Sequence, residues 1–454
     1  MIWFFLSSGI FLGWSLGAND AANVFGSAVG SRMVKFRLAA LVASIFVILG
    51  ATFQGSGGSE TLGKLGSVDA IAGSFTVAFS AAITVFWMTR LKIPVSTSQA
   101  IVGGIVGWNL YTGRTTNAQT LIEIVTTWGS GILLGAVFAI LLFMLLRFLL
   151  NRVSIHLLWR DAWLRFLLLV IGAFGAYSLG ANNIANVMGV FVSAVHFPEL
   201  DLGLFTLSGE QQLFFLGGLA ISLGIITYSK KVMQTVGENI MPLRGETAMV
   251  VVLAQALVLF VLSSQHLSDA FQAIGLPRIP LVPVSSSQVI IGAILGIGLL
   301  KGVQNMRFNI LGTISLGWLA TPLITGVIAF FSLFFVSNVF KLEVQQPQAG
   351  TEKPVVLVLS DSLPVLLKTA DSVMHNDSIL LDLPASKVDV ENTGNNSIPI
   401  VVLFMVIGIL VLMASAITFL FIRQKSINHN LMEIKAQLNE WMENEGGINT
   451  KRFQ

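Results

Sequence analysis

The sequence is short of charge and has no cysteine. Only 11% of its 454 residues are Asp, Glu, Lys or Arg, whereas soluble domains carry roughly a quarter. Because 54% of the residues are hydrophobic, the polar surface is too small to cover a water-soluble globule. The absence of cysteine excludes disulfides, thiolate metal sites and cysteine catalysis. Together these shortages predict an all-α polytopic protein of the lipid bilayer.

Catalytic and nucleotide-binding patterns are also missing. The histidines are scattered without metal-ligand spacing, and no nucleophile–base pair or nucleotide motif stands out. We therefore predict that the protein is not an enzyme, needs no cofactor and is not driven by ATP. The net charge of +3 does not indicate a nucleic-acid partner, because basic residues on a membrane protein usually record its topology.

The chain contains apolar runs that are long enough to cross a bilayer, which takes about 20 residues. We predict eleven such spans: 2–25, 36–54, 71–89, 94–111, 121–146, 166–191, 212–229, 247–264, 283–300, 310–338 and 398–422. No basic segment precedes the first run, so we interpret it as a retained span and not as a cleaved signal peptide.

The basic residues predict the orientation of these spans. One set of alternate loops holds fourteen Lys and Arg, while the intervening short loops hold Lys64, Arg114 and Arg278. Because cytoplasmic loops carry the excess of basic residues, we predict an integral plasma (inner) membrane protein. Its N-terminus lies outside and its C-terminus in the cytoplasm.

Two pairs of similar motifs occur in the same order in the two halves of the chain. The first pair is Gly17-Ala-Asn-Asp-Ala-Ala-Asn23 and Gly180-Ala-Asn-Asn-Ile-Ala-Asn186. The second pair is Pro94-Val-Ser-Thr-Ser-Gln99 and Pro283-Val-Ser-Ser-Ser-Gln288. Five predicted spans, an odd number, separate the two copies of the first motif, so the halves have opposite orientations. This pattern predicts an inverted-repeat secondary transporter with broken or re-entrant helices.

We accordingly divide the chain into five parts. Residues 1–150 form transmembrane repeat 1 and residues 151–340 the inverted repeat 2. Residues 341–397 resemble a small α/β extracytoplasmic insert, for which a flexible loop is the alternative. The last transmembrane helix is 398–422. A cytoplasmic tail, 423–454, has the apolar spacing of a short amphipathic helix.

Asp20 is the most informative residue, because it lies between apolar segments within a predicted span. A charge at that depth costs at least ~2.5 kcal/mol and needs a partner, yet no Lys or Arg occurs before residue 32. A bound cation would supply the missing charge, with Asn19 and Asn23 adding the oxygen ligands that hard cations prefer. The alternative is an interfacial Asp that caps a half-helix.

The matching motif in the second half offers amide oxygens without a charge. We include Asn182, Asn183 and Asn186 in the same predicted cation centre because they repeat the Asp20 motif. The alternative is ordinary hydrogen bonding between helices, worth roughly 0.6 kcal/mol each.

The Pro-Val-Ser motifs resemble helix starts, since Pro favours the first turn and Ser or Thr the cap. Helix N-termini bind oxyanions through free N–H groups and the helix dipole. Two such starts at one place would hold a phosphate or sulfate without a basic side chain, whereas a single copy would be only a good cap. The predicted phosphate-binding residues are Ser96, Thr97, Ser98, Gln99, Ser285, Ser286, Ser287 and Gln288.

At these motifs, residues 1–340 resemble the inorganic phosphate transporter (PiT) family. The resemblance implies a homodimeric inverted-repeat symporter that moves phosphate with Na+, or with H+ in some members. It also implies a Na+ centre at Asp20, Asn23, Asn183 and Asn186. Many members have Asp in both copies of the first motif, whereas this chain has Asn183 in the second. The core therefore carries one fewer negative charge than in those members.

We expect secondary active transport of inorganic phosphate, coupled to Na+ symport by alternating access. The alternatives are an H+-coupled phosphate or sulfate symporter, a passive anion channel built from the same helix ends, and a receptor or assembly role for the 341–397 insert.

Overall fold

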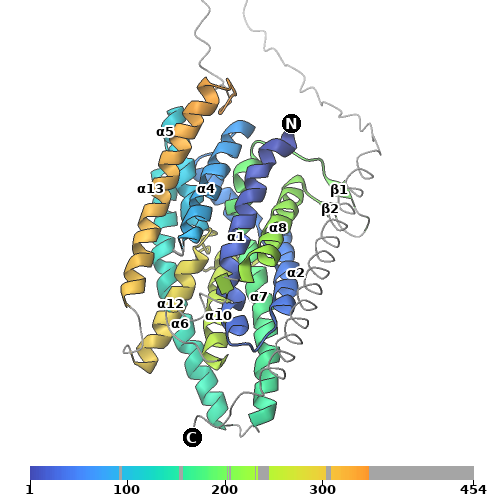
Figure 1. The fold of residues 1–454 in the computed structure, drawn as a ribbon, viewed down its shortest axis with the longest axis vertical. Helices are drawn as coiled ribbons and strands as arrows, with labels where there is room; N and C mark the ends of the chain where they lie inside the picture. The colour runs from blue at the N-terminus through green and yellow to red at the C-terminus, as the bar shows by residue number, and fades with distance from the viewer. Residues whose placement is uncertain are drawn as a thin grey trace, which may run out of the picture. The chain divides into compact units, whose positions relative to one another are not determined.

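The computed structural model describes residues 1–91, 95–152, 157–201, 203, 206–230, 232–233, 245–302 and 308–346 (Figure 1). Nearly all of these residues are helical, which confirms the predicted all-α polytopic fold. The predicted insert beyond residue 346, the last span at 398–422 and the tail at 423–454 lie outside the described residues.

The order of the helices follows from the apolar runs of the chain. In chain order they are α1 (Ile2–Gly30), α2 (Phe36–Gln54), α3 (Ser56–Leu65), α4 (Ile71–Arg90), α5 (Thr97–Thr112), α6 (Ala118–Arg152), α7 (Leu157–Val192), α8 (Gly209–Thr227), α10 (Gly245–Ser263), α11 (Gln265–Ala273), α12 (Ser286–Lys301) and α13 (Phe308–Asn338). Between α7 and α8, β1 (Leu200–Asp201) pairs antiparallel with β2 (Thr206–Leu207), with Leu200 opposite Leu207.

Eight helices in the described part of the chain are long and apolar enough to span a membrane: α1, α2, α4, α6, α7, α8, α10 and α13. Two other predicted spans, 94–111 and 283–300, are shorter than a full crossing. Their helices, α5 and α12, have 16 residues each and are about 24 Å long, against a hydrocarbon core of about 30 Å. Both begin inside the repeated Pro-Val-Ser motifs, as the prediction of broken or re-entrant helices requires.

The helices of the two halves pack reciprocally. Helix α1 contacts α8 and α4, and α7 contacts α2 and α10 in the equivalent way. Likewise α5 packs along α13, and α12 along α6 (Figure 1). In Figure 1, α1 begins at the top of the view and α7 at the bottom. The packing is therefore that of an inverted repeat.

Glycines in the first motif allow two of these contacts. A Cβ added to Gly17 would lie 1.9 Å from the carbonyl oxygen of Ile221 in α8. A Cβ on Gly180 would lie 2.2 Å from that of Val47 in α2. The backbones approach so closely that only glycine fits at either position.

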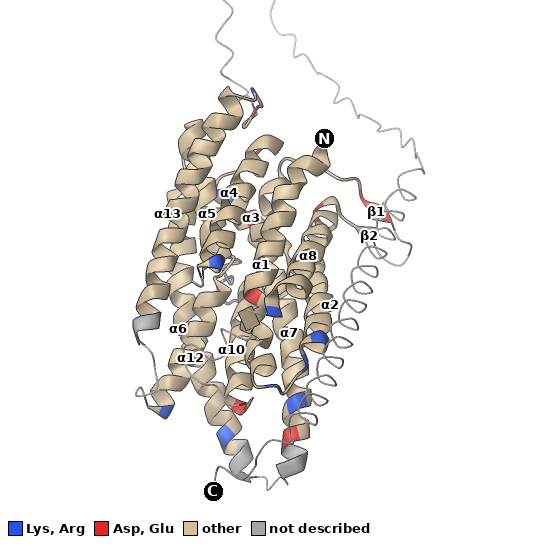
Figure 2. Ribbon diagram, in the orientation of Figure 1, with Lys and Arg blue, Asp and Glu red and all other residues tan. Residues whose placement is uncertain are grey.

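The outer helices present apolar side chains. Within an apolar stretch of 18 residues, only 17% of α6 and 22% of α13 are buried inside the protein. No charged residue lies along α13 (Figure 2). Exposed side chains such as Leu133, Leu141 and Phe331 therefore form a surface suited to lipid.

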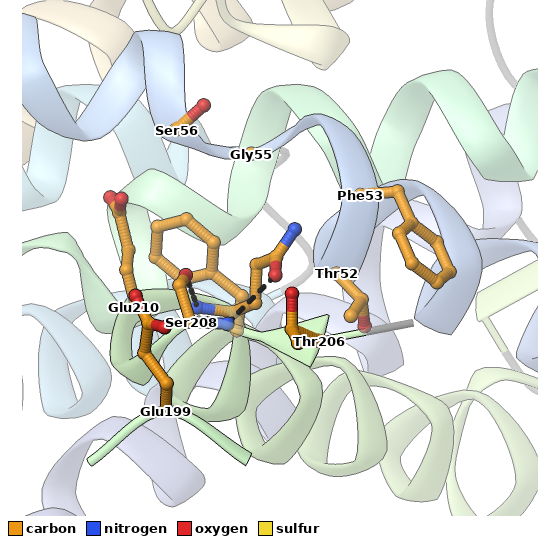
Figure 3. A pocket seen from close by; sticks show the side chains of 10 residues that line it. Thr52, Phe53, Gly55, Ser56, Glu199, Thr206, Ser208 and Glu210 are labelled. Carbon is orange, nitrogen blue, oxygen red and sulfur yellow. Dashed lines mark hydrogen bonds between the residues drawn. The ribbon is translucent and has the colours of Figure 1, made fainter. Parts of the chain in front are cut away.

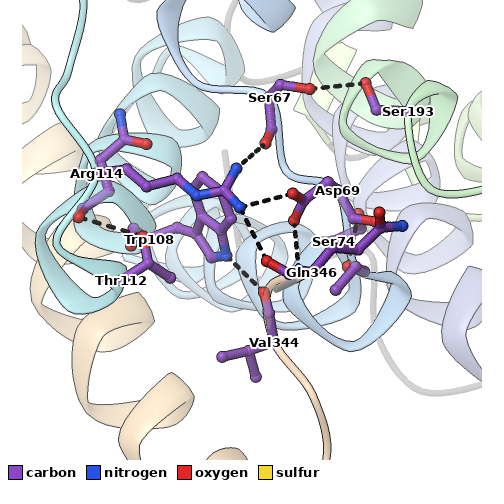
Figure 4. A network of polar contacts seen from close by, with 11 residues as sticks. Ser67, Asp69, Ser74, Trp108, Thr112, Arg114, Ser193, Val344 and Gln346 are labelled. Atoms are coloured by element: carbon purple, nitrogen blue, oxygen red, sulfur yellow. Dashed lines mark hydrogen bonds and ion pairs between the residues drawn. The ribbon is translucent and has the colours of Figure 1, made fainter. Parts of the chain in front are cut away.

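The segment after α13 is tied to the ends of α4 and α5 (Figure 4). The Trp108 indole donates to the Val344 carbonyl at 2.8 Å. Arg114 Nη2 lies 2.7 Å from Asp69 Oδ2, and the Gln346 amide donates to Asp69 Oδ1 at 3.0 Å. These bonds hold α5 by the end opposite its repeated motif.

Candidate functional site

The two repeated Pro-Val-Ser motifs begin α5 and α12 in the same way. Ser96 Oγ accepts a hydrogen bond from the Gln99 amide at 3.3 Å, and Ser285 Oγ accepts one from the Gln288 amide at 3.3 Å. Each serine is thus the N-cap of its helix, and both predicted helix starts are confirmed.

The two helix starts also exchange hydrogen bonds. Ser98 Oγ donates to the Val284 carbonyl at 3.2 Å. Ser287, which has the same place in the other motif, donates to the Val95 carbonyl at 3.3 Å. The N-termini of α5 and α12 therefore meet inside the protein, where each contributes about half a positive charge.

Asp20 lies beside the start of α12 and is 2% exposed. Its Oδ2 accepts a hydrogen bond from Ser286 Oγ at 2.6 Å, and its Oδ1 accepts one from Asn19 Nδ2 at 2.9 Å. Asn23 Nδ2 donates to the same Ser286 hydroxyl at 3.4 Å. Both direct partners of the carboxylate are neutral, so its charge is not compensated by either of them.

Two asparagines of the second half, Asn183 and Asn186, form a separate cluster at the start of α5. Asn186 Nδ2 donates to Ser98 Oγ at 2.8 Å and lies 3.1 Å from Asn183 Oδ1. Asn182 binds the backbone of Val284 twice, donating to its carbonyl at 2.8 Å and accepting from its amide at 2.9 Å. Asn182 therefore fixes the extended segment before α12.

In the structure, each copy of the first motif contacts the Pro-Val-Ser motif of the other half of the chain. Asp20 and Asn23 contact Ser286, which lies in the second half. Asn186 contacts Ser98, which lies in the first half, and also donates to Asn183. Each cluster thus joins predicted cation ligands to a predicted phosphate-side serine, whereas the two roles were assigned to separate motifs in the sequence.

Several acceptor oxygens around these clusters are buried and have no hydrogen-bond partner within the described residues. They are Thr97 Oγ1, Gln99 Oε1, Asn186 Oδ1, Gln255 Oε1 and Gln288 Oε1. Buried polar atoms normally have partners, and oxygens without donors are the ligands that hard cations take. A glutamine amide that rotates by 180° presents N–H groups instead, so the same side chain can also serve an anion.

Gln255, on α10, was not among the predicted site residues. It is 1% exposed, and its Nε2 lies 3.5 Å from the Ser286 carbonyl oxygen. The signal in the sequence was a single amide within an otherwise apolar span, which usually faces the interior of a bundle.

No group of three or more His, Asp or Glu side chains comes together in the part of the chain that the structure describes. The side chains that bond to Asp20, Asn19 and Ser286, are neutral, so a cation centre there would combine this carboxylate with neutral oxygens.

A cavity of about 290 Å³ lies away from these clusters, between the end of α2, the β1–β2 hairpin and the start of α8 (Figure 3). Glu199 and Glu210 line it, and Glu210 accepts a hydrogen bond from Ser59 at 2.5 Å. None of the predicted site residues borders this cavity, so it is distinct from the clusters at the helix starts.

Comparisons with known proteins identify the family to which the chain belongs. The family described as "Phosphate transporter family" matches residues 16–329 and 270–420. A Pyrococcus furiosus protein named "Putative phosphate permease" is 27% identical over 402 residues, covering 71% of this chain and 92% of that protein. The sulfate permease CysP of Bacillus subtilis is 28% identical over 344 residues, covering 73% of this chain and 88% of that permease.

A solved structure, that of a protein named "The sodium-dependent phosphate transporter", has the same fold. It superposes with a TM-score of 0.58 at 22% identity, and the match covers 74% of this chain and 99% of that chain. Because the family match extends over most of the 454 residues and includes both repeated motifs, the chain belongs to the phosphate transporter family.

Proposed function

We propose that this protein carries inorganic phosphate across the membrane together with Na+, by alternating access. The observation that carries the proposal is the buried Asp20 carboxylate, whose hydrogen-bond partners among the described residues are neutral and which lies beside the meeting point of α5 and α12. A buried negative charge without a counter-charge is unfavourable, and a bound cation would supply that counter-charge.

A charge balance shows why phosphate needs a co-transported cation. At neutral pH inorganic phosphate carries between one and two negative charges, and an ionised Asp20 adds another. The two helix starts supply roughly +0.5 each. One to two negative charges therefore remain, and about one to two Na+ ions would neutralise them. Each ion then favours binding of the other, and this coupling is reciprocal.

We assign the roles within the site as follows. Na+ binds beside Asp20 and Asn23 and beside Asn183 and Asn186, where buried oxygens gather. Phosphate binds at the paired helix starts, which provide backbone N–H groups and serine hydroxyls. The remaining polar side chains complete the shell: Asn19, Asn182, Ser96, Thr97, Ser98, Gln99, Ser285, Ser286, Ser287 and Gln288.

The similarity to a transporter named as sodium-dependent supports sodium coupling, and the inverted repeat supports alternating access between two sides. From the distribution of basic residues we further propose a plasma (inner) membrane protein with the N-terminus outside and the C-terminus in the cytoplasm. The resemblance to the phosphate transporter family supports the proposal of a homodimer.

Uptake of radiolabelled phosphate into proteoliposomes tests the coupling. An inward Na+ gradient should drive phosphate above its external concentration, and an equal K+ gradient should not. Equal uptake under both conditions would refute sodium coupling, and uptake that follows a pH gradient would replace it by proton coupling. Uptake that only equilibrates would indicate a passive channel.

The variant Asp20→Asn tests the site. It should abolish Na+-dependent uptake while the protein still inserts, because the amide keeps the volume but removes the charge that attracts the cation. Glu60→Gln is the matched control, since this carboxylate is exposed on α3 and pairs with Lys64. Normal sodium dependence in Asp20→Asn would remove Asp20 from its role.

Sulfate is the second candidate substrate, because a Bacillus subtilis relative is named a sulfate permease. Competition by excess unlabelled sulfate or arsenate in the same assay distinguishes the anions. Strong inhibition by sulfate, together with direct uptake of labelled sulfate, would favour this candidate.

A further inference from the structure

A small pocket lies where α1, α4 and the end of α8 meet. We call it the Arg90 pocket; its walls include Trp14, Ser15, Phe86, Arg90 and Tyr228. The centroid of the Trp14 ring lies 6.2 Å from that of Phe86 and 5.7 Å from that of Tyr228. These rings narrow the pocket to a volume of about 10 Å³, which is room for about one water.

Arg90 places a positive charge at this pocket. Its Cζ lies 5.1 Å from the Phe86 ring centroid and 5.9 Å from that of Tyr228. None of the ion pairs between described residues involves Arg90. Contacts with ring faces orient a guanidinium but leave its N–H donors available for an anion.

Ser15 extends the pocket toward Asp20. Ser15 is 3% exposed, and its hydroxyl has no partner within the described residues. A buried hydroxyl without a partner is costly, so a ligand or water is expected beside it. Asn19 lies one turn further along the same face of α1 and donates to Asp20. Asn19 is half-buried whereas Asp20 is buried. Ser15 and Asn19 therefore connect the pocket to Asp20 along one face of α1.

The equivalent position in the other half has no base. Phe11 contacts Phe86 at 5.9 Å between centroids, and its repeat counterpart Phe174 contacts Phe260 at 5.5 Å. Four residues after Phe86 comes Arg90, but four residues after Phe260 comes Ser264. The aromatic contact therefore occurs in both halves of the inverted repeat, whereas the arginine occurs at this position only in the first half.

We propose that the Arg90 pocket is one mouth of the transport route, on the side that the basic residues predict to be cytoplasmic. There Arg90 would attract an oxyanion that enters from that side before it passes Ser15 and Asn19. The inference rests on the proposed phosphate transport. A basic group at a narrow entrance raises the local concentration of an anion and its rate of binding by about 10- to 1,000-fold, and salt weakens the effect. The aromatic rings must separate for the anion to pass.

Cysteine labelling tests the route, because the natural chain contains no cysteine. Ser15→Cys should react with a negatively charged, water-soluble methanethiosulfonate reagent, and Na+ with phosphate should slow the reaction at least ~10-fold. Ser44→Cys is the control, since Ser44 is also buried with an unpartnered hydroxyl but does not border the pocket. Equal reaction at both positions, or no protection by phosphate, would overturn the proposal.

Kinetics of uptake test Arg90 itself. For transport that starts from the Arg90 side, Arg90→Gln should raise the KM for phosphate about 10-fold at low ionic strength and less at high ionic strength, with a smaller change in maximal rate. Arg90→Lys should restore most of the affinity. An unchanged KM in Arg90→Gln would overturn the proposal, as would a loss that does not depend on salt.

The wild-type chain is assayed first in the same proteoliposomes. If it takes up phosphate while the Arg90 variants behave normally, only the inference about the mouth fails. If the wild type takes up no phosphate, the proposed function itself fails.

Discussion

Gly17 in α1 is the position where the packing of the two halves can be tested by a single methyl group. In Gly17→Ala the added Cβ would lie 1.9 Å from the Ile221 carbonyl oxygen, whereas ordinary contact begins near 3.4 Å. Helices α1 and α8 must therefore separate by roughly 1.5 Å. Backbone cannot rotate away as a side chain can, so the destabilisation should approach ~3 kcal/mol, the upper part of the usual range for overpacking.

The same displacement reaches the proposed site, because Asp20 lies one turn from Gly17 on α1. Its 2.6 Å hydrogen bond with Ser286 cannot survive a shift of that size. A misplacement of about 1 Å in a functional site can reduce a rate on the order of 100-fold. We therefore expect Gly17→Ala to lower both the thermal stability of the detergent-solubilised protein and its phosphate uptake.

Gly129→Ala is the control, because a Cβ at Gly129 on α6 meets nothing within 4 Å. Alanine in place of glycine should stabilise that helix by up to ~1 kcal/mol. The repeat counterpart Gly180→Ala should behave like Gly17→Ala. Normal melting and uptake in Gly17→Ala would refute the close approach of α1 and α8, as would equal damage in Gly129→Ala.

Three further predictions concern polar contacts. Asn182→Ala should destabilise the protein by about 1–3 kcal/mol in thermal melts, because the buried Val284 amide loses its partner; unchanged melting would contradict this. Asn19→Ala should leave melting nearly unchanged but raise the Na+ concentration for half-maximal uptake, because Asn19 contacts the Asp20 carboxylate; an unaltered Na+ dependence would count against it. Asp69→Asn and Arg114→Gln should each lower the melting temperature slightly, and together less than additively, because the two side chains form one partly exposed pair; full additivity would show that the pair contributes nothing.

The membrane fold and the motifs of the site could be predicted from the sequence for local reasons. Apolar runs must become helices in a bilayer, since the backbone has no water to bond with. A paired Pro-Val-Ser motif favours helix starts wherever it occurs. An acid such as Asp20 in a span without a base nearby marks a functional position. None of these inferences depends on which helices are neighbours.

The lengths of α5 and α12 were predicted less accurately than the other features. Their apolar runs include the extended residues before Thr97 and Ser286, so composition alone overestimates both helices. Hydropathy records burial, and a segment packed inside a helix bundle is as apolar as one that crosses the membrane.

The sequence by itself determined that this is a polytopic membrane protein with an inverted repeat and an acid, Asp20, within its first span. Only the tertiary structure decided which residues meet: Asp20 with Ser286, which lies 266 positions away, and Asn186 with Ser98. It also added Gln255 and Arg90, which no motif marks. The physical reason is that hydrogen bonds between the halves depend on how antiparallel helices pack around the glycine contacts. That geometry is a property of the whole bundle and of no single segment.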